Sequence, residues 1–210
     1  KNTIFHTDAV QAFGKLKINV KNIDLMSVSG HKIHAQKGIG FLYVKNGIRL
    51  NNIIFGAGQQ KGLRSGTINN EGIIGLYKAS EIAYKNLDEN FNKVYNIRKE
   101  IISLKDKIEN MSINGDEENG IPYILSLSFK DIKGEVLLHA LEDKNIFIST
   151  GSACGSKGKK DLSMIHYINK ENVGSTIRVC FSSDNTIEQA KEFNKAILEI
   201  VPMLRIYKRR

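Results

Sequence analysis

Apolar residues in the first third of the chain form short runs that are separated by glycine and polar residues. Such runs, rich in β-branched and aromatic side chains, predict three strands, over residues 4–7, 25–28 and 38–44. Residues 10–14 favour a short helical turn. Asn46 and Gly47 are typical of a tight turn, and the polar, glycine-rich stretch 56–67 is typical of a functional loop.

The spacing of apolar residues changes to a helical period from about Glu71 onward. Apolar side chains then recur every three or four positions up to Ile108, with an interruption near residues 86–90, which predicts one long helix or two. The remaining pattern predicts strands over residues 123–129, 146–149 and 176–181, and helices over residues 134–141 and 186–206. Thr186 is in the N-cap position of the last helix, and Glu188 lies in its first turn.

These elements divide the chain into a strand-rich α/β part and an α+β part. The pattern changes near residues 70–90, so we expect a first domain over residues 1–80 and a second over residues 81–210. The first part has the apolar strands of a sheet that is buried on both faces, yet it has few helices to cover them. It therefore has the pattern of the second half of a larger parallel sheet.

Composition and charge exclude several classes of protein. The 210 residues include 41% hydrophobic and 25% charged residues, as in ordinary globular proteins. No apolar run approaches the roughly 18–20 residues that span a bilayer, and the first residues lack a signal-peptide core. The net charge of +9 is diffuse and comes without an RNA-binding aromatic signature, which disfavours a nucleic-acid partner. Two cysteines and no metal-ligand spacing predict no disulfide framework and no metal site, and they favour a reducing cytoplasm.

The strongest chemical signal is Ser27-Val28-Ser29-Gly30-His31-Lys32, directly after a short apolar strand. A lysine at a strand exit, beside a histidine and hydroxyl groups, is a candidate Schiff-base lysine, because desolvation and neighbouring cations favour the neutral, nucleophilic amine. Ser29 and His31 are suited to bind an anion such as a phosphate. A lone lysine on a loop would be interpreted as a surface residue, but here the combination of residues favours chemistry.

Asp8 ends the first predicted strand, and Gln11 follows three residues later. A buried aspartate at a strand end fits the partner that pyridoxal phosphate (PLP) enzymes need for the protonated ring nitrogen, and Gln11 is placed to contact the ring oxygen. Taken alone, Asp8 would more simply be a turn or N-cap residue. Thr67 and the exposed N–H groups before a helix near Asn69 form a further, weaker candidate for phosphate binding.

Three residues of the second part are also candidates. Cys154 lies between small residues in a predicted polar loop, residues 151–160, and three lysines follow it within six positions. A positive field favours the thiolate, so Cys154 is a candidate nucleophile, and a small turn residue is the alternative. Arg178 lies mid-strand and needs an anionic partner, either an acidic side chain or a substrate carboxylate. We expect Cys180 to be an inert core residue.

Six segments carry a family resemblance: residues 5–11, 29–32, 37–44, 62–67, 149–154 and 175–178. Together they resemble the cysteine desulfurases, PLP enzymes of the class V aminotransferase group and of fold type I. The order and spacing of the motifs fit over essentially the whole chain, and jointly the motifs are highly specific. The Gly-Ser-Ala-Cys loop resembles the NifS/IscS-type branch rather than the SufS type.

The resemblance implies an α/β fold in which this chain is the C-terminal part of a PLP-dependent transferase of fold type I. It would hold part of the large-domain sheet and a small α+β domain with the mobile cysteine loop. The resemblance also implies that Lys32 carries PLP and moves the substrate Cα proton. Asp8 would pair with the ring nitrogen, Gln11 would contact the ring oxygen, and Ser29 and His31 would hold the phosphate.

The same resemblance implies the reaction and its partners. Thr67 would reach the phosphate from the other subunit of a homodimer, and Arg178 would bind the carboxylate of L-cysteine. Cys154 would attack the substrate sulfur, which leaves L-alanine and a persulfide on Cys154. The persulfide sulfur would pass to an acceptor such as an Fe–S scaffold or a tRNA-thiolation protein.

The chain departs from the family pattern mainly in its length, since family members are nearly twice as long. The absent N-terminal half of the large domain normally brings a phosphate loop, a histidine that stacks on the PLP ring and an asparagine. We therefore expect a C-terminal piece of an enzyme that is inactive alone. Two other functions stay open: another class V PLP enzyme, such as a selenocysteine lyase or aminotransferase, and a non-catalytic truncated interaction module.

Overall fold

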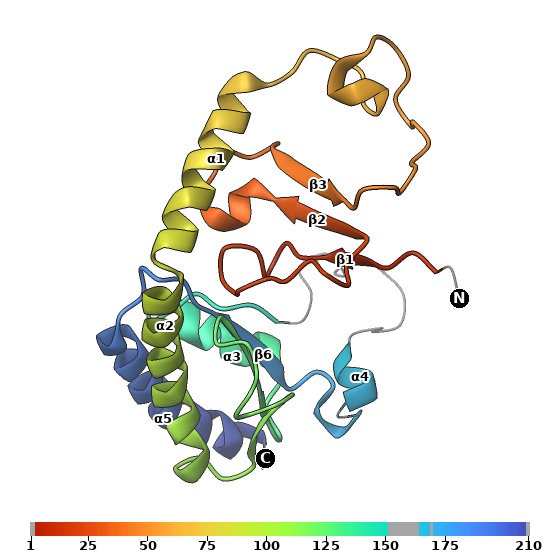
Figure 1. Ribbon diagram of the computed structural model, residues 1–210. Helices are drawn as coiled ribbons and strands as arrows, with labels where there is room; N and C mark the ends of the chain where they lie inside the picture. The colour runs from red at the N-terminus through yellow and green to blue at the C-terminus, as the bar shows by residue number, and fades with distance from the viewer. Residues whose placement is uncertain (1–2, 151–163, 169, 209–210) are drawn as a thin grey trace. The chain divides into compact units, whose positions relative to one another are not determined.

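Figure 1 shows the computed structural model, which describes residues 3–150, 164–168 and 170–208. The chain is an α/β protein that forms two compact units, unit 1 (Lys1–Asn90) and unit 2 (Phe91–Arg210). Each unit has a three-stranded sheet of its own. Within the described ranges, every helix is too short or too polar to cross a membrane.

Unit 1 contains a mixed sheet with the strand order β1-β2-β3. Its strands are β1 (His6–Asp8), β2 (Leu25–Ser29) and β3 (Gly40–Val44). β1 pairs with β2 in parallel, and β2 pairs with β3 in antiparallel orientation. The three predicted strands are confirmed, with ends that differ by at most two residues. A short 3-10 helix, η1 (Gly30–Ile33), follows β2 directly.

The faces of β2 explain where the core of unit 1 lies. Met26 and Val28 are buried and pack with Ala9, whereas Ser27 and Ser29 lie on the opposite face. Alternate residues of a strand point to opposite faces, so β2 presents one apolar and one polar side. The polar side becomes important for the candidate site.

Two consecutive helices follow the glycine-rich segment, and they confirm the helical pattern after Glu71. These are α1 (Asn70–Lys85) and α2 (Leu87–Ile102), with the interruption at Asn86, inside the predicted range 86–90. The side chain of Asn69 accepts a hydrogen bond from the Gly72 N–H at 2.9 Å and so caps α1. Another 3-10 helix, η2 (Gln59–Gly62), lies in the predicted loop 56–67.

Unit 2 contains an antiparallel sheet with the strand order β4-β5-β6. The strands are β4 (Met111–Ile113), β5 (Ile124–Phe129) and β6 (Thr176–Cys180). The helices and 3-10 helices of this unit besides α2 are η3 (Ser103–Asp106), α3 (Gly134–Glu142), α4 (Met164–Ile168), η4 (Lys170–Asn172) and α5 (Ile187–Lys208). The Gln189 N–H donates to Thr186 Oγ1 at 3.3 Å, which confirms Thr186 as the residue that caps the last helix.

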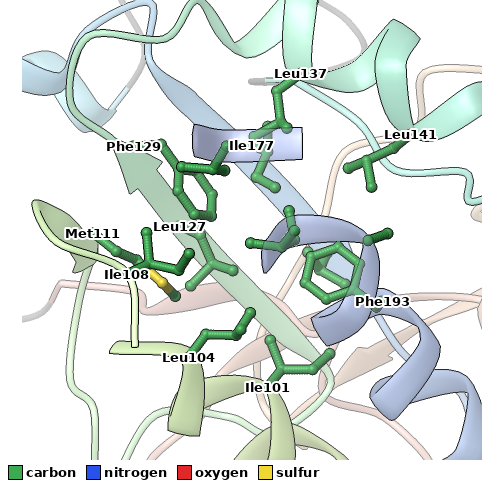
Figure 2. Packing of buried hydrophobic residues seen from close by; sticks show 14 of the residues in the cluster. Ile101, Leu104, Ile108, Met111, Leu127, Phe129, Leu137, Leu141, Ile177 and Phe193 are labelled. Atoms are coloured by element: carbon green, nitrogen blue, oxygen red, sulfur yellow. The ribbon is translucent and has the colours of Figure 1, made fainter. Parts of the chain in front are cut away.

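One face of this sheet forms the larger core of the chain. Figure 2 shows Leu127 and Phe129 of β5 and Ile177 of β6 among side chains of the helices, including Ile101 and Leu137. All five side chains are at most 1% exposed. The period-two pattern of β5 and β6 therefore places their apolar residues against the amphipathic helices.

The predicted strand over residues 146–149 is wrong. Only Ser149 pairs, through backbone hydrogen bonds in both directions with Arg178 (2.6 and 3.1 Å). Ile146 and Ile148 pack against the core while Phe147 is exposed. The alternating pattern of this segment therefore reflects its packing and not a row of hydrogen bonds to a neighbouring strand. The elements β4 and α4 were not predicted, because each is only three to five residues long.

A buried arginine holds the turn that follows β4. Arg98 donates to the carbonyl oxygens of Glu117 at 2.6 Å and Asp116 at 3.0 Å. The Asp116 carboxylate in turn accepts the N–H groups of Asn119 at 2.8 Å and Glu118 at 2.9 Å. These hydrogen bonds lower the pKa of Asp116 from its ordinary value of 3.8. The bond from the Asn119 backbone N–H has the largest effect.

This turn is expected to loosen in acid. Because the pKa of Asp116 is lower in the folded state, its stabilisation is fully present above the unfolded value of 3.8 and is lost as pH falls through the lowered folded pKa. The hydrogen-exchange protection of the Glu118 and Asn119 amides, corrected for intrinsic rates, should therefore decrease in the pH window that begins at 3.8 and extends downward through the folded pKa. Asp116→Asn keeps an acceptor oxygen but cannot titrate, so it should remove the pH dependence. Equal protection on both sides of the window in the unmodified chain would contradict this expectation.

Candidate cofactor and substrate sites

The carboxyl ends of β1 and β2 bring together four of the predicted site residues. Because these strands are parallel and Asp8 lies opposite Ser27, their ends open at the same edge of the sheet. β1 ends at Asp8, β2 ends at Ser29, and η1 then carries His31 and Lys32. Ligands of open α/β sheets bind outside such carboxyl ends.

One of the two carboxylate oxygens of Asp8 accepts no hydrogen bond from the described residues. Its Oδ1 atom accepts the N–H of Val10 at 2.9 Å, which is the turn role that the sequence offers as the simpler interpretation. Within the described residues, no hydrogen bond engages Oδ2. The expectation that Asp8 is buried is wrong, because Asp8 is exposed at the end of a three-residue strand. Its second oxygen is free to accept a ring N–H.

Ser29 and His31 form a linked pair at the end of β2. Ser29 Oγ and His31 Nδ1 are 2.8 Å apart, and Ser29 does not cap η1 with its side chain. The bond fixes the histidine ring and leaves Nε2 for a ligand. Lys32 is exposed beside this pair. A hydroxyl, an imidazole and an ammonium group together provide donors for an anion.

One polar residue of the same sheet face, His6, was not predicted as part of the site, and it contacts Ser27 of the predicted motif. His6 Nε2 and Ser27 Oγ are 2.8 Å apart, next to Asp8. The alternation in residues 25–29 is the signal that places Ser27 with Ser29. Its pairing with His6 depends on the register between β1 and β2, which the sequence does not contain.

Gln11 and Thr67 are exposed residues of unit 1. Gln11 Oε1 accepts a hydrogen bond from Lys15 Nζ at 3.3 Å, which leaves its amide N–H groups for a ligand. Thr67 lies in the segment between η2 and α1, and within the described part of unit 1 no hydrogen bond links it to Asp8 or His31. The Asn69 side chain, which caps α1, accepts the Gly72 N–H and so occupies one of the N–H groups at this weaker phosphate candidate.

Arg178 is half-buried on the face of β6 opposite the core, between the buried Ile177 and Val179. Its Nε atom is buried without a hydrogen-bond partner, and no acidic residue of the described chain forms an ion pair with it. Of the two partners that the sequence allows, an acidic side chain is thus absent from the described residues.

The two cysteines differ in what the structure shows. Cys154 lies outside the described residues. The prediction of a core position for Cys180 is wrong, because Cys180 is a free, exposed thiol at the end of β6. The physical reason is the strand period: Ile177 and Val179 face the core, so Cys180 shares the other face with Arg178. The described ranges also hold no cluster of three or more His, Cys, Asp or Glu side chains suited to a metal.

Known structures establish the fold class to which these sites belong. A solved NifS-like protein matches with a TM-score of 0.84 and 32% identity, over 96% of this chain and 53% of that chain. A NifS-like protein from Rickettsia africae matches with a TM-score of 0.81 and 29% identity, over 94% of this chain and 53% of that chain. The chain thus has the α/β fold of one half of a NifS-like protein, as the resemblance implies.

The family follows from sequence comparison. The family description "Aminotransferase class-V" matches residues 1–193, and the chain belongs to this family. A cysteine desulfurase, IscS, of Clostridium botulinum is 40% identical over 97% of this chain and 52% of its own length. A putative cysteine desulfurase, IscS 1, of Bacillus subtilis is 39% identical over 95% of this chain and 54% of its own length. The chain spans about half the length of these relatives.

Proposed function

We propose that this chain is the part of a PLP-dependent cysteine desulfurase that carries the Schiff-base lysine, the substrate-binding arginine and the sulfur-accepting cysteine. The observation that carries the proposal is the polar edge of unit 1, where Asp8, Ser29, His31 and Lys32 meet at the ends of two parallel strands. Similarity to cysteine desulfurases over nearly the whole chain supports it.

The residues at this edge fit the chemical groups of PLP. The free Oδ2 of Asp8 is an acceptor for the protonated ring nitrogen, and Gln11 offers amide N–H groups to the ring oxygen. Ser29 and His31 are donors for the phosphate, and Lys32 supplies the amine that binds the aldehyde carbon. When bound, PLP supplies an electron sink for negative charge at the substrate Cα.

The other steps of the proposed reaction are carried out by side chains of this chain. Lys32 moves the proton at the substrate Cα, and Arg178 binds the substrate carboxylate, for which its unpartnered Nε is available. The Cys154 thiolate attacks the sulfur of L-cysteine. A sulfur–sulfur bond forms and the Cβ–S bond breaks, with its electron pair kept on the substrate carbon, which takes up a proton to give L-alanine. Cys154 is left as a persulfide.

We further propose that the enzyme is a homodimer of the cytoplasm that hands the persulfide sulfur to an acceptor protein. The segment around Thr67 supports a subunit interface, because Ile53 is 90% exposed and Phe55 78% exposed. Thr67 would then reach a phosphate in the other subunit. The acceptor would be an Fe–S scaffold or a tRNA-thiolation protein.

The proposal is tested by mapping where the cofactor and the sulfur become attached. PLP is titrated into the chain, the linkage is reduced with borohydride, and peptides are identified by mass spectrometry. The label is expected on Lys32 and not on Lys37, an exposed lysine five residues later. L-cysteine is then added to enzyme with the complete class V fold, and a persulfide is expected on Cys154 together with L-alanine.

Each result separates the candidate functions. A label on Lys32 without a persulfide after addition of L-cysteine would favour another class V enzyme, such as a selenocysteine lyase or an aminotransferase. A label spread over surface lysines, in the complete fold as well, would favour a non-catalytic interaction module. Both of these outcomes would contradict the proposed desulfurase.

A further inference from the structure

The sheet of unit 2 has a second face that is polar along its whole width. In β5, Leu125 and Leu127 are buried in the core, so Ser126 and Ser128 lie on the opposite face. In β6 the same alternation places Arg178 on that face. Small polar residues beside a half-buried arginine indicate a surface built for a polar ligand rather than for apolar packing.

The strand register arranges this face in two rows. In the first row, the Asn114 N–H donates to the Ser126 carbonyl oxygen at 2.9 Å, and Ser126 is the cross-strand partner of Arg178. The second row contains Ser112, Ser128 and Thr176. Directly opposite residues have Cβ atoms roughly 4.5–5.5 Å apart, so the Ser126 hydroxyl and the Arg178 side chain lie side by side.

The second row satisfies its own hydrogen bonds. Thr176 Oγ1 donates to the Asn172 carbonyl oxygen at 3.0 Å, so the proton between Ser128 and Thr176 (2.7 Å) comes from Ser128. Ser128 Oγ also accepts from Asn114 Nδ2 at 2.7 Å. Ser128 is completely buried and has a partner in both directions. This row therefore needs no ligand.

The first row is left with polar atoms that have no partner within the described residues, among them the buried acceptor Asn114 Oδ1. Ser126 Oγ accepts from Asn114 Nδ2 at 3.2 Å, and its own proton has no partner within the described residues. Opposite it, the buried Arg178 Nε–H has no partner there either. Leaving such groups unpaired is unfavourable, because they give up hydrogen bonds to water without replacing them. Two neighbouring donors, one of them cationic, are matched by the two oxygens of a carboxylate.

We infer that Ser126 is a second binding residue for the substrate carboxylate, and that it donates its hydroxyl proton to the anion bound by Arg178. The inference rests on the proposed function and deepens it, because it assigns the subsite to the carboxylate of an α-amino acid. Asn114 is a positioning residue in this arrangement. Its amide donates to both serines and so turns the Ser126 proton away from β4, toward Arg178.

The experiment follows the Arg178 Nε–H signal by nuclear magnetic resonance in the full chain. L-alanine is added as the carboxylate probe, and L-alaninamide, which lacks the carboxylate, is the negative control. Ser126→Ala is expected to weaken L-alanine binding roughly 5–10-fold, the loss of one charge-assisted hydrogen bond. Ser126→Thr keeps a hydroxyl and should bind like the unmodified chain.

Ser112→Ala is the matched control. Ser112 lies on the same face and accepts a hydrogen bond from Asn172 Nδ2 at 2.9 Å, but it is two strands away from Arg178. Its replacement should leave L-alanine binding unchanged. Equal binding by Ser126→Ala and the unmodified chain would overturn the inference and leave the proposed desulfurase intact. No response of the unmodified chain to L-alanine would remove Arg178 as the carboxylate site, and the inference with it, whereas the Lys32 label would be unaffected.

Discussion

Cys154→Ser is expected to abolish persulfide formation and to lower alanine production from L-cysteine by roughly 10³–10⁶-fold, as the loss of a catalytic nucleophile does. A thiolate is a strong nucleophile toward sulfur near neutral pH, and the lysines at positions 157, 159 and 160 favour that form. A serine hydroxyl stays protonated and forms no stable bond to sulfur. The measurement is persulfide mapping and alanine analysis in enzyme with the complete class V fold.

The control for this variant is the other cysteine of the chain. Cys180 is a free, exposed thiol, so Cys180→Ser removes a comparable sulfur and should leave alanine production unchanged. Cys154→Ser should also retain the borohydride label on Lys32, because the two residues have separate roles. Unchanged turnover by Cys154→Ser would contradict the desulfurase and favour another class V PLP enzyme, such as an aminotransferase or a selenocysteine lyase.

Much of the fold could be predicted from the sequence because the strongest patterns are local. The helical period after Glu71 and its interruption at Asn86 depend on residues that are near in sequence, and both are found in the structure. The same is true of the Thr186 cap. The predicted strand over residues 146–149 is wrong because alternation of apolar and polar residues shows only which side of an extended segment is buried. A strand also needs a neighbouring strand that pairs with it along its length.

The candidate site was predictable only in part, for a similar reason. Asp8 and Lys32 follow apolar strands, and parallel pairing of those strands brings them to one edge. The contacts between His6 and Ser27, and the row that places Ser126 beside Arg178, depend on register between strands far apart in sequence. Register is set by the packing of whole sheets, so no local motif reports it.

Leu127→Ala is expected to destabilise unit 2 by about 3–5 kcal/mol. Leu127 is 0% exposed at the centre of β5, where Figure 2 shows it surrounded by side chains of the sheet and helices. Its truncation removes buried apolar contacts and leaves a cavity that rigid strands cannot fill. Since domains are stable by only about 5–15 kcal/mol, much of unit 2 would unfold at low denaturant.

The matched control is Leu198→Ala on α5, because Leu198 is 39% exposed and loses little buried area. Surface changes of this kind usually alter the free energy of unfolding by less than about 0.5 kcal/mol. Urea unfolding followed by hydrogen exchange at the Ile177 amide reports on unit 2, since this amide lies in the ladder between β5 and β6. Equal losses of stability in the two variants would mean that the sheet face around Leu127 is not the core that holds Arg178 and Ser126 in register.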